Sequence, residues 1–124
     1  MKKSLLAAAI TVLLATGTAG ATTMIAGPVI VPPDTLLRCS IWHGNKKPLK
    51  NLEIRARIDL NGSSTFNLDT FEPDDFGQIM HRNQNESAFR EGVCVFKFRG
   101  SKKGVRAAAC SMEFPNCGTR AQAE

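Results

Sequence analysis

Alternation of apolar and polar residues is the dominant pattern of this chain. It is clearest in residues 49–60, where every second position is apolar: Leu52, Ile54, Ala56, Ile58 and Leu60. A period of two places these side chains on one face of an extended strand, whereas a helix would distribute them around its axis. The sequence therefore predicts a strand over 49–60 with these five side chains in the core.

Turn-forming residues divide the rest of the chain into further short strands. Asn61-Gly62 directly follows the 49–60 strand, and this pair is the strongest short hairpin signal because both residues tolerate a positive φ. The sequence therefore predicts a hairpin with a return strand at 65–71. Alternation and flanking turn residues predict the other strands, at residues 22–31, 35–42, 76–80, 92–99 and 105–112.

A second hairpin is predicted near the end of the chain. Gly92–Arg99 and Val105–Cys110 are apolar-rich runs on either side of the turn-type residues 100–104. We expect the first of these strands to be the partner of the strand around Cys39. The alanines at 107–109 would also suit a helix, but the turn residues before them favour a strand. A short helical turn is expected near residues 86–90.

The strand pattern as a whole indicates the fold class. About seven or eight strands, with turn signals every eight to twelve residues, are typical of an all-β sandwich. We predict one such domain over residues 22–117, followed by a flexible C-terminal tail at 118–124.

The first 21 residues depart from this pattern and resemble a secretory signal peptide. Two lysines precede an apolar run at residues 5–15, which is shorter than the roughly 20 apolar residues of a membrane-spanning helix. Ala19-Gly20-Ala21 then supplies the small residues of a cleavage site. We predict cleavage after Ala21 and a periplasmic or secreted bacterial protein without a transmembrane segment in its mature chain.

The charge of the predicted mature chain is modest. Loss of the signal lowers the number of lysines and arginines from 16 to 14, against 11 acidic residues. This balance, together with export, argues against nucleic acid as the partner.

All four cysteines, Cys39, Cys94, Cys110 and Cys117, lie in the predicted domain. An even number in a short exported chain predicts two disulfides. Cys39 and Cys94 occupy inward positions of two alternating strands, so a Cys39–Cys94 bridge with Cys110–Cys117 is the preferred pairing. In the predicted second hairpin, however, Cys94 and Cys110 would lie directly opposite each other. Cys94–Cys110 with Cys39–Cys117 therefore stays open.

Three segments together resemble a class of small exported bacterial immunoglobulin-like proteins of unknown function. They are Leu37-Arg-Cys39-Ser-Ile41, Cys94-Val-Phe96-Lys-Phe98 and Val105-Arg106-Ala107. The resemblance implies an immunoglobulin-like β-sandwich whose second and sixth strands carry the Cys39–Cys94 bridge. It implies no catalytic residues.

The sequence contains no recognisable catalytic or metal-binding pattern. His43 and His81, the only histidines, fall in polar turns and are expected at the surface, and no Gly-x-Ser-x-Gly nucleophile elbow is present. The close Cys or His spacing of structural zinc sites is also absent. We therefore expect no enzyme, no metal and no cofactor.

The candidate interaction residues are basic, apart from one tryptophan. They are Trp42, Lys46, Lys47, Arg99, Lys102, Lys103 and Arg106. The lysines fall in two turns that could share one end of a sandwich and form a patch for an anionic glycan or lipid headgroup, although charged hairpin loops are also common at solvated surfaces. Trp42 is expected to point outward.

The predicted function is a binding or envelope-interaction module without enzymatic activity. Its partner would be a protein, a glycan or the envelope surface. The alternative is a small secreted inhibitor or effector that contacts a protein through a loop closed by Cys110 and Cys117.

Overall fold

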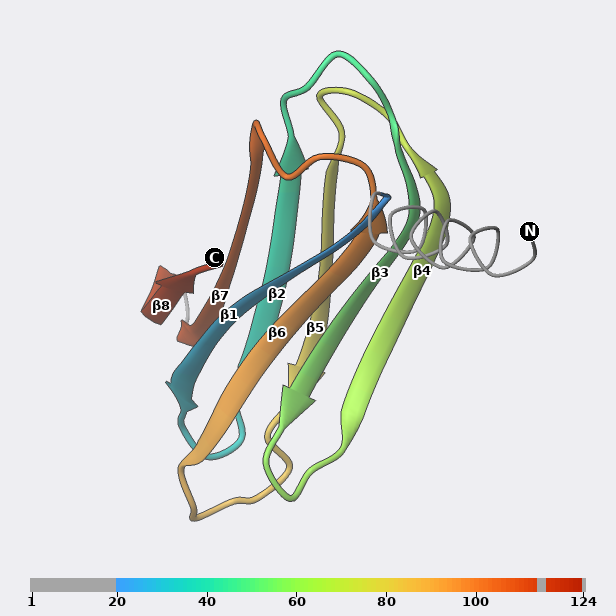
Figure 1. Cartoon of the computed structure of the whole chain (residues 1–124). Helices are drawn as coiled ribbons and strands as arrows, with labels where there is room; N and C mark the ends of the chain where they lie inside the picture. Colours follow the sequence, from blue (N-terminus) through green and yellow to red (C-terminus); the bar gives the residue numbers. More distant parts are fainter. Residues whose placement is uncertain (1–19, 114–115, 124) are drawn as a thin grey trace, which may run out of the picture.

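The computed structural model describes residues 20–113 and 116–123, in which all regular elements are β-strands (Figure 1). In chain order they are β1 (Ala21–Val31), β2 (Leu36–His43), β3 (Leu49–Ile58), β4 (Ser63–Phe71), β5 (Phe76–Arg82), β6 (Arg90–Arg99), β7 (Val105–Glu113) and β8 (Asn116–Gln122). The predicted all-β class is confirmed. Residues 1–19 of the predicted signal peptide lie outside the described part of the chain.

The strands form two antiparallel sheets that pack face to face. The first sheet has the order β1-β6-β3-β4. The second has the order β5-β2-β7, with β8 beside β7 at its edge. The backbone of β8 pairs with β7 over much of the segment 118–124 that was expected as a tail. Along the described residues no helix is long and apolar enough to cross a membrane.

The core forms where the apolar faces of the two sheets meet, as the alternation predicts. Leu52, Ile54, Ala56 and Ile58 of β3 are all buried. The prediction for Leu60 was wrong, because β3 ends at Ile58 and Leu60 turns out of the sheet with φ 63° and 77% of its surface exposed. The Asn61-Gly62 hairpin is confirmed, and β4 begins at Ser63, two residues earlier than predicted.

The second predicted hairpin does not form. β6 lies between β1 and β3 in the first sheet, whereas β7 lies beside β2 in the second. Both strands have one apolar face, and alternation shows which face is buried without showing which strand is the neighbour. Residues 100–104 carry the chain across one end of the sandwich, with positive φ at Gly100 and Gly104.

The Cys39–Cys94 disulfide joins the two sheets through the core, which confirms that half of the preferred pairing. It excludes the alternative Cys94–Cys110 bridge. The side chain of Cys117 lies outside the described residues, so the Cys110–Cys117 bridge stays a prediction. Because disulfides persist mainly in oxidising compartments, the Cys39–Cys94 bridge is consistent with an exported protein.

The central strands have the neighbours of an immunoglobulin sandwich, whereas the edge strands are exchanged. β2 pairs with β5, β3 pairs with β6, and the bridge joins β2 to β6, as in that fold. In an immunoglobulin domain, however, the first strand flanks the second and the last flanks the sixth. Here β1 flanks β6 and β7 flanks β2. The crossing made by residues 100–104 accounts for the place of β7 beside β2.

Two other local expectations are settled by the strand and loop conformations. The alanine-rich segment is strand β7, as favoured. The helical turn expected at 86–90 is absent, and this part of the chain is an irregular loop. The side chain of Asn85 holds that loop by accepting hydrogen bonds from the backbone amides of Ser87 and Ala88. Such local side-chain hydrogen bonds compete with helix formation.

Candidate functional site

Two loops that cross between the sheets meet at one end of the sandwich. Residues 44–48 join β2 to β3, and residues 100–104 join β6 to β7, both at the upper end in Figure 1. The amide of Gly44 donates to the carbonyl oxygen of Gly104 over 3.1 Å. Gly104 has a φ of 80°, and a Cβ there would collide with the side-chain oxygen of Asn45. Glycine at this position therefore suits the positive φ and leaves room for the Asn45 side chain.

His43 holds the first of these loops from beneath. Its Nε2–H donates to the carbonyl oxygen of Lys47 over 2.6 Å, and its Nδ1 accepts from the amide of Asn45 at 3.3 Å. The ring is fully buried and stacks on Phe71, with centroids 5.7 Å apart. The prediction of a surface His43 was wrong, because His43 is the last inward position of β2 and the polar turn begins only after it.

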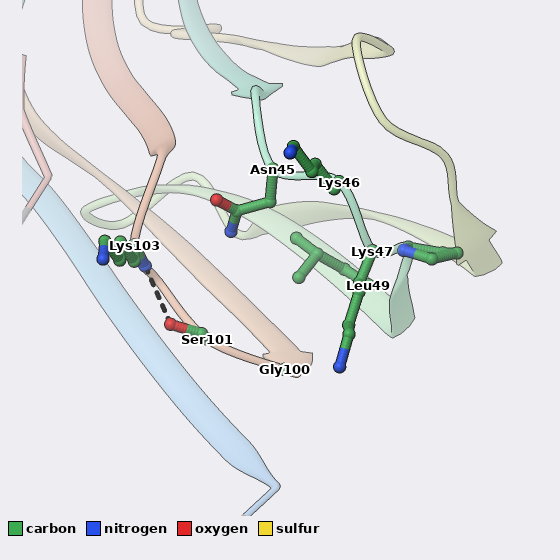
Figure 2. Close-up of a pocket in the computed structure, with 8 residues that line it drawn as sticks. Asn45, Lys46, Lys47, Leu49, Gly100, Ser101 and Lys103 are labelled. Carbon is green, nitrogen blue, oxygen red and sulfur yellow. Dashed lines mark hydrogen bonds between the residues drawn. The ribbon is translucent and has the colours of Figure 1, made fainter.

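The two loops border an open cleft of about 330 Å³ (Figure 2). Its floor is the buried side chain of Leu49, which lies between the loops, and Gly100 leaves room for it. The amide of Lys103 donates to the hydroxyl of Ser101 over 3.1 Å, which fixes the second loop. The lining residues are Asn45, Lys46, Lys47, Pro48, Leu49, Gly100, Ser101 and Lys103.

The cleft is cationic. Three of its eight lining residues are lysines, and none of the eight is acidic. Both ion pairs found between described side chains, Arg55–Glu53 and Arg82–Asp34, lie elsewhere on the molecule. The acidic loop 72–75 reaches the same end through backbone hydrogen bonds with His43, but it does not line the cleft. The ammonium groups are therefore available to an anionic ligand.

The structure divides the predicted interaction residues into two neighbouring groups. Lys46, Lys47 and Lys103 share the cleft. Lys102 and Arg99 are exposed beside it, in and just before the second loop. Trp42 and Arg106 instead lie on the outer face of the second sheet, where they line a separate hollow of about 190 Å³.

Asn45, Pro48 and Ser101 belong to the cleft but were not among the candidates. Each is next to or one residue from a lysine in a turn, so adjacency was the available signal. Phe76 was also missed, although it begins a predicted strand. It lies across from Trp42 in the sheet, and only the strand pairing places it there.

His81 was also predicted at the surface in a polar turn, and this was wrong. It lies half-buried on β5, where its Nδ1 contacts the hydroxyl of Ser64 at 2.7 Å and its Nε2 contacts the carbonyl oxygen of Asn61 at 2.7 Å. These bonds tie β5 to the β3–β4 hairpin, which belongs to the other sheet. In the described ranges, no three His, Cys, Asp or Glu residues are grouped as a metal site would require.

Comparison with protein-family models and with curated proteins gives no significant match. Among solved structures, the chain is similar to the carbohydrate-binding module TmCBM61, determined in complex with β-1,4-galactotriose. The TM-score is 0.45 at 10% sequence identity, over 86% of this chain and 61% of that one. A likeness this distant says nothing about the ligand.

Proposed function

We propose that the protein is a binding module whose cleft holds an acidic polysaccharide. The observation that supports this most directly is that Lys46, Lys47 and Lys103 line one hollow that no carboxylate lines. Asn45 and Ser101 add neutral hydrogen-bonding groups between them. Ammonium groups attract sulfates and carboxylates, and amide and hydroxyl groups suit the hydroxyls of a sugar ring.

The fixed backbone of the cleft favours binding of a defined ligand. His43 and the Gly44–Gly104 hydrogen bond hold the first loop, and the Ser101 hydroxyl holds the second. A site whose loops are already ordered loses less conformational entropy when a ligand binds. The lysine side chains remain free to adjust to the spacing of the anionic groups.

The distribution of charge favours a polysaccharide over an anionic membrane. A flat membrane would approach the whole end of the sandwich, including Glu72, Asp74 and Asp75, and these exposed carboxylates would be repelled by anionic headgroups. A narrow chain can lie in the lysine-lined cleft without meeting this acidic loop. The cleft volume is also within the range of small-ligand sites.

The test measures affinity for heparin, with neutral dextran as the comparison polymer. We expect Lys46→Gln/Lys103→Gln to weaken heparin binding roughly tenfold at low salt, about 1.4 kcal/mol, because two ammonium contacts are lost. The matched control is Arg57→Gln/Lys97→Gln, which removes the same charge from the outer face of the first sheet, away from the cleft. It should leave the affinity within about twofold of the wild type.

Two outcomes would contradict the proposal. In one, both double variants weaken binding equally, which would show a response to net charge alone. In the other, vesicles of anionic phospholipid bind more tightly than heparin and depend on the same two lysines, which would favour a membrane ligand.

A further inference from the structure

An aromatic and cationic row crosses the outer face of the second sheet. Trp42 on β2 pairs with Phe76 on β5 to one side and with Arg106 on β7 to the other. All three side chains point away from the core, since the flanking Ile41 and His43 are buried. Trp42 is 38% exposed and Phe76 60% exposed.

A shallow hollow lies beside this row because the next row has small side chains. Ser40 pairs with Ala108, two residues along each strand from the Trp42–Arg106 pair and therefore on the same face. Their size leaves the hollow of about 190 Å³, walled by Trp42, Phe76 and Arg106. A flat group could lie on Ser40 and Ala108 with an aromatic ring against one side.

The Trp42 ring lies against the loop that forms the cleft. A Cβ on Gly44 would overlap the six-membered part of the indole ring, so the ring lies directly against the Gly44 backbone. Glycine here leaves room for the ring in this position, without an unusual φ. The contact limits movement of the ring toward the loop, while 38% of Trp42 stays exposed to a ligand.

Trp42 and the lysine cleft are adjacent. Gly44, which the indole ring contacts, precedes Asn45 of the cleft wall in sequence. Between the two hollows runs the Gly44–Gly104 hydrogen bond, with the Trp42 ring against Gly44 and the Asn45 side chain against Gly104. The basic charge also continues, since Arg106 borders the second hollow as Lys103 borders the first.

Resting on the proposed function, we propose that the acidic polysaccharide extends from the lysine cleft past the Gly44–Gly104 contact onto the Trp42–Arg106 row. There a sugar ring packs on the indole, whose electron-rich face attracts the C–H groups of the ring. Arg106 binds a carboxylate or sulfate of the same chain. The ligand is therefore an oligosaccharide several sugars long, and a single acidic sugar fills only the cleft.

Trp42 reports on this contact directly because it is the only tryptophan in the chain. The experiment titrates the unmodified protein with a heparin disaccharide and a heparin octasaccharide, following intrinsic fluorescence and calorimetric heat. We expect both to bind, and only the octasaccharide to change the fluorescence. A wild-type measurement of this kind does not depend on whether a variant folds.

Two variants separate the two parts of the surface. Trp42→Ala should weaken octasaccharide binding at least about tenfold and leave disaccharide binding unchanged. Phe89→Ala, which removes an exposed aromatic ring from the loop at the opposite end, should change neither. Arg106→Gln should act like Trp42→Ala, with a smaller effect.

The outcomes distinguish this inference from the proposed function. If the octasaccharide binds without changing the fluorescence, and Trp42→Ala does not weaken its binding, the proposed contact with the Trp42–Arg106 row is overturned. The proposed binding in the lysine cleft is then unaffected. Loss of all heparin binding to the wild type would overturn both. A third outcome would also overturn the inference: the fluorescence changes with protein concentration, and the protein forms a dimer that Trp42→Ala disrupts. This outcome would show that a second copy of the chain covers this face.

Discussion

At the scale of single residues, two buried polar side chains organise the two ends of the sandwich. His43 holds the cleft loop at one end. At the other end, Asn83 is fully buried. The two hydrogens of its Nδ2 are shared among the carbonyl oxygens of Val31, Pro32 and Ala88, and its Oδ1 accepts from Asn61 and Asn85.

These two residues allow stability and binding to be separated. His43→Ala leaves the amide of Asn45 and the carbonyl of Lys47 without their partner and creates a cavity, which should lower the free energy of unfolding by about 2–4 kcal/mol. Asn83→Ala should cost a similar amount, because several buried groups lose their partner. Urea unfolding measures both values.

Heparin affinity should respond to only one of the two substitutions. His43→Ala loosens the loop that carries Lys46 and Lys47, so we expect weaker binding under conditions in which the variant is still folded. Asn83→Ala acts at the far end and should bind heparin as the wild type does. Equal heparin affinity of the two folded variants would show that His43 does not order the cleft.

At the scale of secondary-structure elements, the sequence was most informative about strands and least about their neighbours. The alternation in β3 and the Asn61-Gly62 turn are local features, and both appear in the structure as expected. The placement of β6 and β7 in different sheets depends on contacts far apart in sequence. A loop such as 100–104 can close a hairpin or cross between sheets, and its composition is similar in both cases.

The crossing loop 100–104 spans a greater distance than a hairpin turn does. Paired strands lie about 4.8 Å apart, whereas packed sheets lie about 10 Å apart. We therefore expect that replacing residues 100–104 with Asn-Gly prevents the native fold, since this pair favours a tight hairpin turn that would place β7 beside β6. Circular dichroism and thermal melting would detect the loss. A variant that melts cooperatively near the wild-type temperature would contradict the observed crossing.

At the scale of the whole molecule, the two-sheet arrangement assembles the candidate site from separate parts of the chain. The basic residues of two turns were recognisable in the sequence, and so was the possibility that the turns share an end. The cleft, its glycine contacts and the row beside Trp42 could not be predicted. They depend on which strands are paired, and for His43 on where β2 ends.

The upper end of the molecule in Figure 1 carries basic loops on one side and an acidic loop on the other. Lysines of the loops 44–48 and 100–104 line the cleft, and the acidic loop 72–75 stands beside β2 at the same end. This division is the basis for expecting a narrow anionic chain as the ligand. A large flat anionic surface would meet both charges at once.

The salt dependence of heparin binding tests the central claim most directly. Each lysine that contacts a polyanion releases counterions, so the logarithm of the association constant falls with the logarithm of salt concentration, by a slope of about one for each contact. Calorimetric titration at several salt concentrations should therefore give Lys46→Gln/Lys103→Gln a slope smaller than the wild type by about two. Arg57→Gln/Lys97→Gln should keep the wild-type slope. Identical slopes for all three proteins would contradict the assignment of the lysine cleft as the binding site.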